Sequence, residues 1–359
     1  MPKPTKSKRQ TGPVICPGAR LARMPAVIKP MLATLVDEPF SDPDWIFETK
    51  WDGFRSVCFL KSGKAQFVSR NLLDMTLQYP ELARIGDQVK ADQAILDGEI
   101  VALDEHGMPR FQLLQPRHGR KNARDIARLA RTSRIVYYVF DLLYYNGYDL
   151  MSCALVDRKA LLEKIIRPGK IANYSFHIAA DGEKFFQEIE KFRLEGMMAK
   201  RTASPYVQKR SSDWLKVKTV QRSEVVIGGY TKPRRSREYF GALVAGLYRA
   251  GELHYVGHTG GGFNRQSLKQ IYELLQPLKS SDCPFVVKPP TNEPVQWIKP
   301  KLVAEVKFSE WTADNRMRHP IFVGLREDKR PGQCTFEIER DTDKVVKKKK
   351  PATSRKKTL

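Results

Sequence analysis

The sequence predicts an α+β domain with antiparallel sheets, followed by a smaller, all-β domain. Three observations lead to this fold class. The chain has 359 residues, which is more than one ordinary domain needs and favours two. Short strands alternate with helical stretches up to about residue 220, and β-rich runs separated by glycine-containing turns follow. Hydrophobic residues make up 41% of the chain and aromatic residues 10%, which is enough for a substantial core.

The strands and helices expected in the first domain follow from the spacing of apolar residues and from turn signals between them. Residues 51–60 and 65–69 form a predicted hairpin, because Ser62-Gly63 offers a turn between two strand-like runs. Residues 135–143 are nearly all apolar and fit a strand buried on both faces. Further strands are expected over 94–103, 196–200 and 214–220, and helices over 77–89, 156–166 and 183–192.

The second domain is expected to consist of short strands. They cover residues 224–231, 242–249, 253–258, 302–311 and 321–325, with one helix over 264–275. This content suits a small barrel of the OB type, although a sandwich would also fit. The predicted domains span residues 30–222 and 223–331, between a basic flexible arm over 1–29 and a basic flexible tail over 332–359.

The charge of the chain is strongly positive and concentrated at its ends. Lys and Arg number 63 against 40 Asp and Glu, for a net charge of +23. Residues 1–36 carry seven basic groups and residues 344–359 carry eight, with no acidic group in either segment. This distribution indicates a polyanionic partner, with a solubilising tail as the alternative. Neither end has an apolar face, which disfavours a membrane or acidic-protein partner.

The sequence also excludes several classes of protein. It contains no apolar run of about 20 residues, as a membrane helix would require, and no apolar region of a secretory signal. Its five cysteines are far apart and form no CxxC pair, which argues against a zinc ribbon or a disulfide framework. We therefore expect a reducing cytoplasm, while the Lys run at 347–350 leaves nuclear import open.

Residues 48–55, with the sequence E-T-K-W-D-G-F-R, are the most informative segment for chemistry. No GxxxxGK[ST] loop or strand-following GxGxxG is present to cradle a phosphate in the common ways. Lys50 lies among aromatic residues, with Asp52 and Arg55 close by. A lysine attacks only as the neutral amine, and burial or neighbouring cations can lower its pKa from about 10.4. The alternative is a surface turn at Asp52-Gly53 with a solvated Lys50.

Six further segments follow in a fixed order. They are S-R-N at 69–71, D-G-E at 97–99, V-F-D at 139–141, E-G-M-M-A-K at 195–200, W-L-K-V-K at 214–218 and R-E-D-K at 326–329. Together with residues 48–55 they resemble the covalent nucleotidyltransferases, which are the ATP-dependent polynucleotide ligases and mRNA capping enzymes. The resemblance covers about residues 30–330. It implies an α+β nucleotidyltransferase (adenylation) domain over 30–222 and an OB-fold domain over 223–331.

Three other segments are similar to one subfamily. M-L-A-T-L at 31–35, F-Q-L-L-Q at 111–115 and R-H-P-I-F at 318–322 look like the ligase module of bacterial non-homologous end-joining ligase D. That module is usually fused to polymerase and phosphoesterase domains, for which a chain of 359 residues has no room. The expectation is a free-standing ligase of this type.

The resemblance gives Lys50 the role of nucleophile. It would attack the α-phosphate of ATP, form a phosphoramidate with AMP and release pyrophosphate, with Asp52 of the same motif counted among the catalytic residues. Lys216 and Lys218 alternate on a predicted strand and so point to one face. The resemblance places that face at the α-phosphate, where the two cations would stabilise developing charge and lower the pKa of Lys50.

Two glutamates are the candidate metal ligands. Glu99 and Glu195 would hold Mg²⁺ or Mn²⁺ near the α-phosphate, since carboxylates suit these ions. The alternatives are an exposed acid at a strand end for Glu99 and a helix-terminal acid for Glu195. Lys200 would pair either with a phosphate or with a neighbouring carboxylate.

The nucleotide and the nucleic acid have further expected contacts. Phe140 would stack on the adenine face and Glu48 would accept a hydrogen bond at the adenine edge, which would favour ATP over GTP. Arg55 and Arg70 would bind the ribose region and the 5′-phosphate of the nucleic acid, or else form structural ion pairs. Arg326, Asp328 and Lys329 would act only if the second domain closes over the nucleotide and orients the leaving pyrophosphate.

The function expected from these residues is ATP-dependent sealing of 5′-phosphate/3′-hydroxyl nicks in DNA repair or end joining. The partner would be nicked or broken duplex DNA, bound through its phosphate backbone in a salt-dependent way. A DNA-end-binding protein is a possible recruiter, and a nucleoid-associated monomer is expected. The alternatives are an RNA ligase or GTP-dependent capping-type enzyme, and a non-catalytic nucleic-acid-binding protein. The four-cysteine zinc site of NAD⁺-dependent ligases has no counterpart here.

Overall fold

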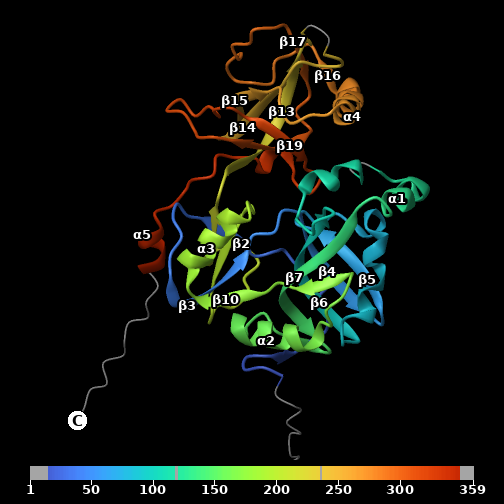
Figure 1. The fold of residues 1–359 in the computed structure, drawn as a ribbon, viewed down its shortest axis with the longest axis vertical. Helices are drawn as coiled ribbons and strands as arrows, with labels where there is room; N and C mark the ends of the chain where they lie inside the picture. The colour runs from blue at the N-terminus through green and yellow to red at the C-terminus, as the bar shows by residue number, and fades with distance from the viewer. Residues whose placement is uncertain (1–14, 118–119, 235–236, 348–359) are drawn as a thin grey trace, which may run out of the picture.

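The computed structural model describes residues 15–117, 120–234 and 237–347. A large lobe holds the first part of the chain and a smaller lobe is stacked on it along the long axis of the molecule (Figure 1). The long strand β13 (Gln221–Thr231) leads from the large lobe into the small one, and the last described residues return to the large lobe. None of the helices in the described ranges has the length and apolar character that a membrane span requires.

The first sheet of the large lobe has seven strands in the order β1-β8-β7-β6-β4-β5, with β9 attached to β7. The pairs are antiparallel except for β7 with β9. The strands are β1 (Arg20–Leu21), β4 (Phe54–Lys61), β5 (Lys64–Ser69), β6 (Gln93–Leu103), β7 (Arg134–Tyr145), β8 (Tyr148–Asp149) and β9 (Ala172–Tyr174). The predicted hairpin and the strand buried on both faces are therefore confirmed as β4–β5 and β7.

The second sheet has five strands in the order β10-β3-β11-β12-β2. Its pairs are antiparallel except for β12 with β2. The strands are β2 (Leu32–Leu35), β3 (Asp42–Thr49), β10 (His177–Ala180), β11 (Gly196–Arg201) and β12 (Arg210–Lys218). An apolar cluster that includes Phe140, Val57 and Trp214 lies between the two sheets, so a cavity at its edge is lined by both.

Helices cover the outer faces of the large lobe. Helix α2 (Leu155–Ile165) packs against β7, and α3 (Gly182–Lys191) packs against β3 and β11. A third helix, α1 (Ala123–Leu129), projects from the lobe beside the junction with the small lobe (Figure 1). Asn122 caps α1 by accepting hydrogen bonds from the backbone N–H groups of Arg124 and Asp125.

The small lobe is a curved antiparallel sheet with one long helix, α4 (Arg265–Leu275). Strand β13 pairs along its first half with β18 and along its second half with β14 and β17. The other strands are β14 (Leu243–Arg249), β15 (Glu252–Thr259), β16 (Lys279–Ser280), β17 (Val295–Ile298), β18 (Val303–Phe308) and β19 (Ile321–Leu325). The prediction of an OB-type domain is confirmed, although the described strands do not close a continuous barrel and an isolated bridge between Gly261 and Ile321 links its two ends.

Residues 77–89 do not form the predicted α-helix. They form two 3₁₀ segments, η1 (Thr76–Gln78) and η2 (Pro80–Asp87). Pro80 separates the two segments, because proline has no backbone N–H and disfavours helical backbone at Tyr79 before it. Leu82 and Ile85 still reach the core, so the apolar spacing indicates the buried face correctly.

Both ends of the described chain are packed where a flexible segment was expected. Within the predicted arm over 1–29, β1 pairs with β8 and Ile28 is 1% exposed. Within the predicted tail over 332–359, residues 342–347 form helix α5 (Thr342–Lys347) beside β2 and β3 (Figure 1). Both segments carry apolar residues that are buried against the large lobe. The prediction of flexible ends was based on their basic charge and did not take these apolar residues into account. The remainder, residues 1–14 and 348–359, lies outside the described residues.

Candidate active site

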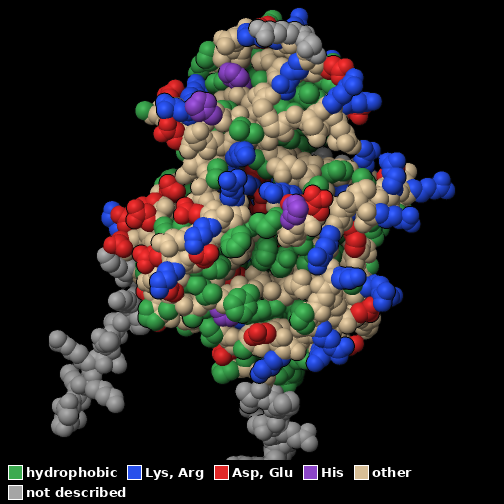
Figure 2. Space-filling model, viewed as in Figure 1, with side chains coloured by type: hydrophobic (Ala, Val, Ile, Leu, Met, Phe, Trp, Pro, Cys, Tyr) green, Lys and Arg blue, Asp and Glu red, His purple; other side chains and the backbone are tan. Residues whose placement is uncertain are grey.

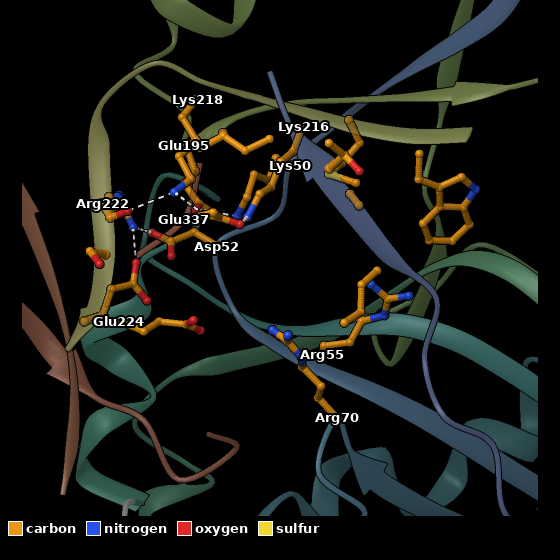
Figure 3. A pocket seen from close by; sticks show the side chains of 18 of the residues that line it. Lys50, Asp52, Arg55, Arg70, Glu195, Lys216, Lys218, Arg222, Glu224 and Glu337 are labelled. Atoms are coloured by element: carbon orange, nitrogen blue, oxygen red, sulfur yellow. Dashed lines mark hydrogen bonds and ion pairs between the residues drawn. The ribbon is translucent and has the colours of Figure 1, made fainter. Parts of the chain in front are cut away.

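The two lobes and the segment after β19 surround a cavity of about 490 Å³ (Figure 3). Every residue that the sequence predicts for the site lines this cavity. They are Glu48, Lys50, Asp52, Arg55, Arg70, Glu99, Phe140, Glu195, Lys200, Lys216, Lys218, Arg326, Asp328 and Lys329. The fold thus gathers residues from both lobes that are nearly 300 positions apart in the sequence.

Lys50 follows the last residue of β3 and points into the cavity (Figure 3). Its backbone N–H donates to the carbonyl of Gly196 over 2.9 Å, and its Nζ forms an ion pair with Glu195. Burial by itself would lower the pKa of Lys50, but the negative charge of Glu195 outweighs it and the pKa is raised. The expectation of a lowered pKa is therefore wrong for this structure, because a carboxylate and not a cation is the nearest charge.

The turn after Lys50 depends on Gly53. A Cβ atom at this position would lie 2.2 Å from the carbonyl oxygen of Ile100 in β6, so a larger residue would displace the strand. Asp52, in the same turn, accepts from Arg222 Nη1 over 3.0 Å. Burial and the charge of Glu195 raise the pKa of Asp52 to about 6, although Arg222 opposes the shift. The turn therefore places a second titratable group beside Lys50.

Two of the acidic residues at this end of the cavity fit a divalent cation. Burial raises the pKa of Glu99 to about 8, with Arg55 and Lys50 opposing the shift. The described residues contain no group of three or more His, Cys, Asp or Glu side chains arranged to hold a metal. Mg²⁺ commonly uses one or two carboxylates together with substrate phosphates, so Glu99 and Glu195 stay the predicted ligands.

Glu48 is 1% exposed and forms ion pairs with two lysines. Lys200 Nζ lies 2.8 Å from one oxygen of Glu48, and Lys159 Nζ lies 2.8 Å from the other. Burial opposes ionisation of Glu48, but these two charges keep its pKa below the usual range. Of the two roles considered for Lys200, the structure shows the pairing with a carboxylate. Lys159 was missed, because a lysine in helix α2 is indistinguishable by sequence from a surface lysine.

Replacing Lys159 by Met should destabilise the protein, because Glu48 would keep its burial and lose one of its two cations. Removing one partner of a buried ion pair typically costs about 3 kcal/mol of unfolding free energy. Urea denaturation would measure the loss, with Lys164→Met on the exposed face of the same helix as the matched control. A loss no larger than the control's would contradict this assignment.

Phe140 is 7% exposed and is covered by cations on the cavity side. Lys200 Nζ lies 4.2 Å from its ring centroid, and the Arg55 guanidinium lies 4.5 Å from it. Arg55 also donates to both carboxylate oxygens of Asp97 over 2.6 Å each, which is the structural ion pair considered for it. Arg70 lies beside Arg55 at the same end of the cavity (Figure 3). Stacking of Phe140 on adenine stays a prediction.

Lys216 and Lys218 point to the same side of β12, as their alternation predicts (Figure 3). Both contact Glu337, with Lys216 Nζ 2.5 Å from one oxygen and Lys218 Nζ 3.5 Å from the other. Burial lowers the pKa of Lys216 to about 8 even though Glu337 opposes the shift. Burial would raise the pKa of Glu337, but the two lysines outweigh it and lower the value to about 2. Glu337 lies in the segment over 332–359 that the sequence predicts to be a flexible tail, so sequence alone does not identify it as a site residue.

The small lobe contributes a second group of charges. Arg326 donates to both oxygens of Asp328 over 2.8 Å each and to Glu305 over 2.7 Å, and Lys329 pairs with Glu224. Arg222 connects the lobes, because it contacts Asp52 in the large lobe over 3.0 Å and Glu305 in the small lobe over 3.1 Å. Arg222 and Glu305 lie outside the motifs, and only the folded chain brings them to the cavity.

The two lobes are held in a closed arrangement by polar contacts beside the cavity. Gln115 in the large lobe accepts from the backbone N–H of Leu325 over 2.7 Å and donates to its carbonyl over 3.1 Å. Gln78 donates to Glu327 over 3.0 Å, and Asn71 donates to the carbonyl of Asp328. The R-E-D-K segment therefore lines the same cavity as Lys50, and its action on the leaving pyrophosphate stays a prediction.

Comparison with known proteins identifies the family. A family model described as the ATP dependent DNA ligase domain matches residues 30–218, and the ATP dependent DNA ligase C terminal region matches residues 236–329. The chain belongs to the ATP-dependent DNA ligase family. The two matched regions correspond to the large lobe and the small lobe, so the predicted resemblance and fold class are confirmed.

Two individual proteins and one solved structure show how similar the chain is to members of this family. The multifunctional non-homologous end joining protein LigD of Pseudomonas aeruginosa is 38% identical over 342 residues, covering 91% of this chain and 40% of that protein. A DNA ligase of Pyrobaculum calidifontis is 33% identical over 340 residues, covering 86% of this chain and 58% of that protein. The solved structure of mycobacterial DNA ligase D complexed with ATP and MES is 33% identical and matches 86% of this chain and 98% of that chain, with a TM-score of 0.64.

The chain thus spans about two fifths of the length of the LigD relatives and nearly all of the solved mycobacterial chain. The family match and the likeness to a chain solved with ATP support ATP as the nucleotide. The cavity between the lobes is accordingly the candidate adenylation site of this ligase.

Proposed function

We propose that this chain seals 5′-phosphate/3′-hydroxyl nicks in duplex DNA through an AMP covalently attached to Lys50. The observation that carries the proposal is the cavity itself. It holds one lysine at the end of β3, a pair of lysines on β12 and the R-E-D-K segment of the small lobe within one closed site. A non-catalytic binding protein would have no need for this arrangement.

In the first step Lys50 loses its proton and attacks the α-phosphate of ATP. The Nζ–phosphorus bond forms, the bond to the bridging oxygen breaks, and pyrophosphate leaves. Lys216 and Lys218 stabilise the charge that develops on the α-phosphate, which is the type of preorganised contact that contributes most to such reactions. Arg326 and Lys329, held in place by Asp328 and Glu224, face the leaving group.

Glu99 and Glu195 are the carboxylates that would hold Mg²⁺ or Mn²⁺ at this site. When bound, the ion supplies positive charge to the phosphates of the nucleotide. Glu195 also forms the ion pair with Lys50, so the same carboxylate positions the amine before it loses its proton.

In the second step AMP passes to the 5′-phosphate of a nick, and in the third the 3′-hydroxyl attacks and AMP leaves. Both steps need DNA at the cavity, so the small lobe has to move away from it.

The surface offers positive charge for the phosphate backbone of DNA. Figure 2 shows Lys and Arg side chains over α1 and along the junction between the lobes, and Arg124 and Arg128 of α1 are exposed. Arg70 at the cavity mouth would bind the 5′-phosphate. Binding through such charges weakens strongly with salt.

End joining is the pathway that the LigD relatives favour. We propose that this ligase acts in DNA repair or end joining as a nucleoid-associated, cytoplasmic monomer, recruited to breaks by a DNA-end-binding protein. The basic residues of 1–14 and 348–359 would add backbone contacts. Each of these assignments rests on the resemblance and on charge.

Sealing of a labelled nick tests the proposal. We expect ATP and a divalent ion to convert a 5′-phosphorylated nicked duplex into a continuous strand, whereas an unphosphorylated nick stays open. A nick with ribonucleotides on both sides and a reaction with GTP separate the RNA ligase and capping-type alternatives. Sealing that prefers RNA or GTP, or no sealing with any metal, would contradict the proposed function.

The rate of enzyme-AMP formation should rise from pH 6 to about pH 8 and level off above it. The raised pKa of Lys50 keeps the amine protonated at low pH, and Glu99, with a pKa of about 8, gains the charge that attracts a metal only as pH increases. Lys216, whose pKa is also about 8, loses its charge above that value. Single-turnover adenylation across this range would test the profile. Lys216→Arg should let the rate continue to rise above pH 8, since arginine stays protonated, and a wild-type rate that does not change between pH 6 and pH 8 would contradict the assignment.

A further inference from the structure

The segment after the R-E-D-K motif crosses the cavity from the small lobe to the large lobe. We call residues 334–347 the C-terminal strap. At its start, Thr335 bridges to Tyr248 in β14, and the Phe336 ring lies 4.4 Å from the guanidinium of Arg249. These two contacts attach the start of the strap to the small lobe.

The far end of the strap is attached to the large lobe. The backbone N–H of Arg340 donates to the carbonyl of Leu35 over 3.2 Å, and the N–H of Asp37 donates to the carbonyl of Arg340 over 3.2 Å. Thr342 donates through its hydroxyl to Asp37 over 2.8 Å, and Val345 and Val346 of α5 pack against the apolar cluster outside the second sheet. Both ends are thus anchored, and residues 337–339 span the cavity between them.

Glu337 is the strap residue that reaches the reaction centre. Its two oxygens contact Lys216 and Lys218, the pair assigned to the α-phosphate (Figure 3). A carboxylate and a phosphate present the same feature to an ammonium group, namely anionic oxygens that accept charge-assisted hydrogen bonds. Glu337 therefore occupies the lysine pair in the way that a nucleotide phosphate would.

We propose that the C-terminal strap is an autoinhibitory element in which Glu337 competes with the nucleotide for Lys216 and Lys218. ATP has to displace this carboxylate before the lysine pair can engage its α-phosphate. Because one end of the strap belongs to each lobe, opening of the lobes pulls Glu337 away from β12. In the closed enzyme at low ATP concentration, the strap therefore keeps the lysine pair occupied and blocks the first step. This inference rests on the proposed adenylation at Lys50.

Glu337→Gln is the direct test, since it keeps the shape of the side chain and removes its charge. Label transfer from α-labelled ATP would be measured across ATP concentrations, with Glu339→Gln as the control. Glu339 lies two residues further along the strap, and among the described residues its carboxylate forms no ion pair. We expect the KM for ATP to fall by about three- to tenfold in Glu337→Gln, the range of a partly exposed charge contact, with kcat unchanged.

The outcomes separate this inference from the proposed function. If wild type and Glu339→Gln form the adduct and Glu337→Gln has the same or a higher KM, the autoinhibitory role is wrong and the lysyl-AMP assignment stands. If wild type forms no adduct, the proposed function fails, and the strap is judged by proteolysis. Trypsin should cut after Arg340 faster when α,β-methylene ATP is present, and faster in Glu337→Gln without it. Cleavage that ignores both changes would overturn the proposal.

Discussion

Replacing Lys50 with alanine should reduce enzyme-AMP formation by roughly 10⁴-fold or more, to below detection, because the variant lacks the atom that bonds to AMP. Lys50 is the lysine that follows β3, and its Nζ lies in the cavity beside Glu195. The other lysines at the cavity already hold partners: Lys200 holds Glu48, and Lys216 holds Glu337. Denaturing electrophoresis after incubation with α-labelled ATP would measure the loss.

Two controls make this result specific. Lys61→Ala, at the exposed end of β4, should form the adduct at the wild-type rate. Lys50→Ala should still join a nick that already carries AMP on its 5′-phosphate, since the amine takes no covalent part in the last step. Retention of the label by the variant would show that another residue is the nucleophile. Failure of both steps with a lowered melting temperature would instead indicate loss of the fold, since Glu195 loses its partner.

Replacing Lys216 with alanine should lower the rate of the first step by about 10²- to 10³-fold, the usual effect of removing one preorganised contact to developing charge. Lys216 and Lys218 project from the same face of β12, so Lys218 alone would have to support the α-phosphate. Single-turnover label transfer at saturating ATP isolates this effect from ATP binding.

Lys209→Ala is the matched control for Lys216, because it removes an exposed lysine just before the same strand. Its rate should stay at the wild-type value. Lys216→Arg should recover part of the rate, since the charge is restored with a different shape. A loss of less than threefold in Lys216→Ala would exclude a direct role at the α-phosphate.

The charges of the cavity are arranged in pairs, and this affects how the reaction can begin. Lys50 with Glu195, Lys216 with Glu337 and Lys200 with Glu48 each neutralise one another. Buried or half-buried charges require such partners. In the proposed reaction, a bound nucleotide would bring new negative charge to these lysines and would have to replace some of the pairs. In this structure the negative charge of Glu195 outweighs burial and raises the pKa of Lys50, which favours the protonated amine.

Sequence alone could predict most of the secondary structure and every site residue that lies in a motif. Strand β19 begins and ends where the apolar run does, and the alternation of Lys216 and Lys218 gives their shared face. These features are local, so a short stretch of sequence carries them. Strand β3 was missed because Pro43 and its acidic neighbours hide the apolar residues that follow.

The contacts that sequence could not predict are those between distant parts of the chain. Lys159 reaches Glu48 from helix α2, and Arg222 connects Asp52 with the small lobe. Glu337 lies in a polar segment whose composition resembles a flexible tail, and only its neighbours in space reveal its role. The pKa of Lys50 was misjudged for the same reason, because motif spacing does not show which charge lies nearest.

Locating the AMP adduct tests the central claim most directly. The enzyme would be incubated with ATP and Mg²⁺, and its peptides analysed by mass spectrometry before and after addition of nicked duplex DNA. We expect one AMP on the peptide that contains Lys50, and its loss as sealed DNA appears. An adduct on another lysine, or an adduct on Lys50 that persists while DNA is sealed, would contradict the account.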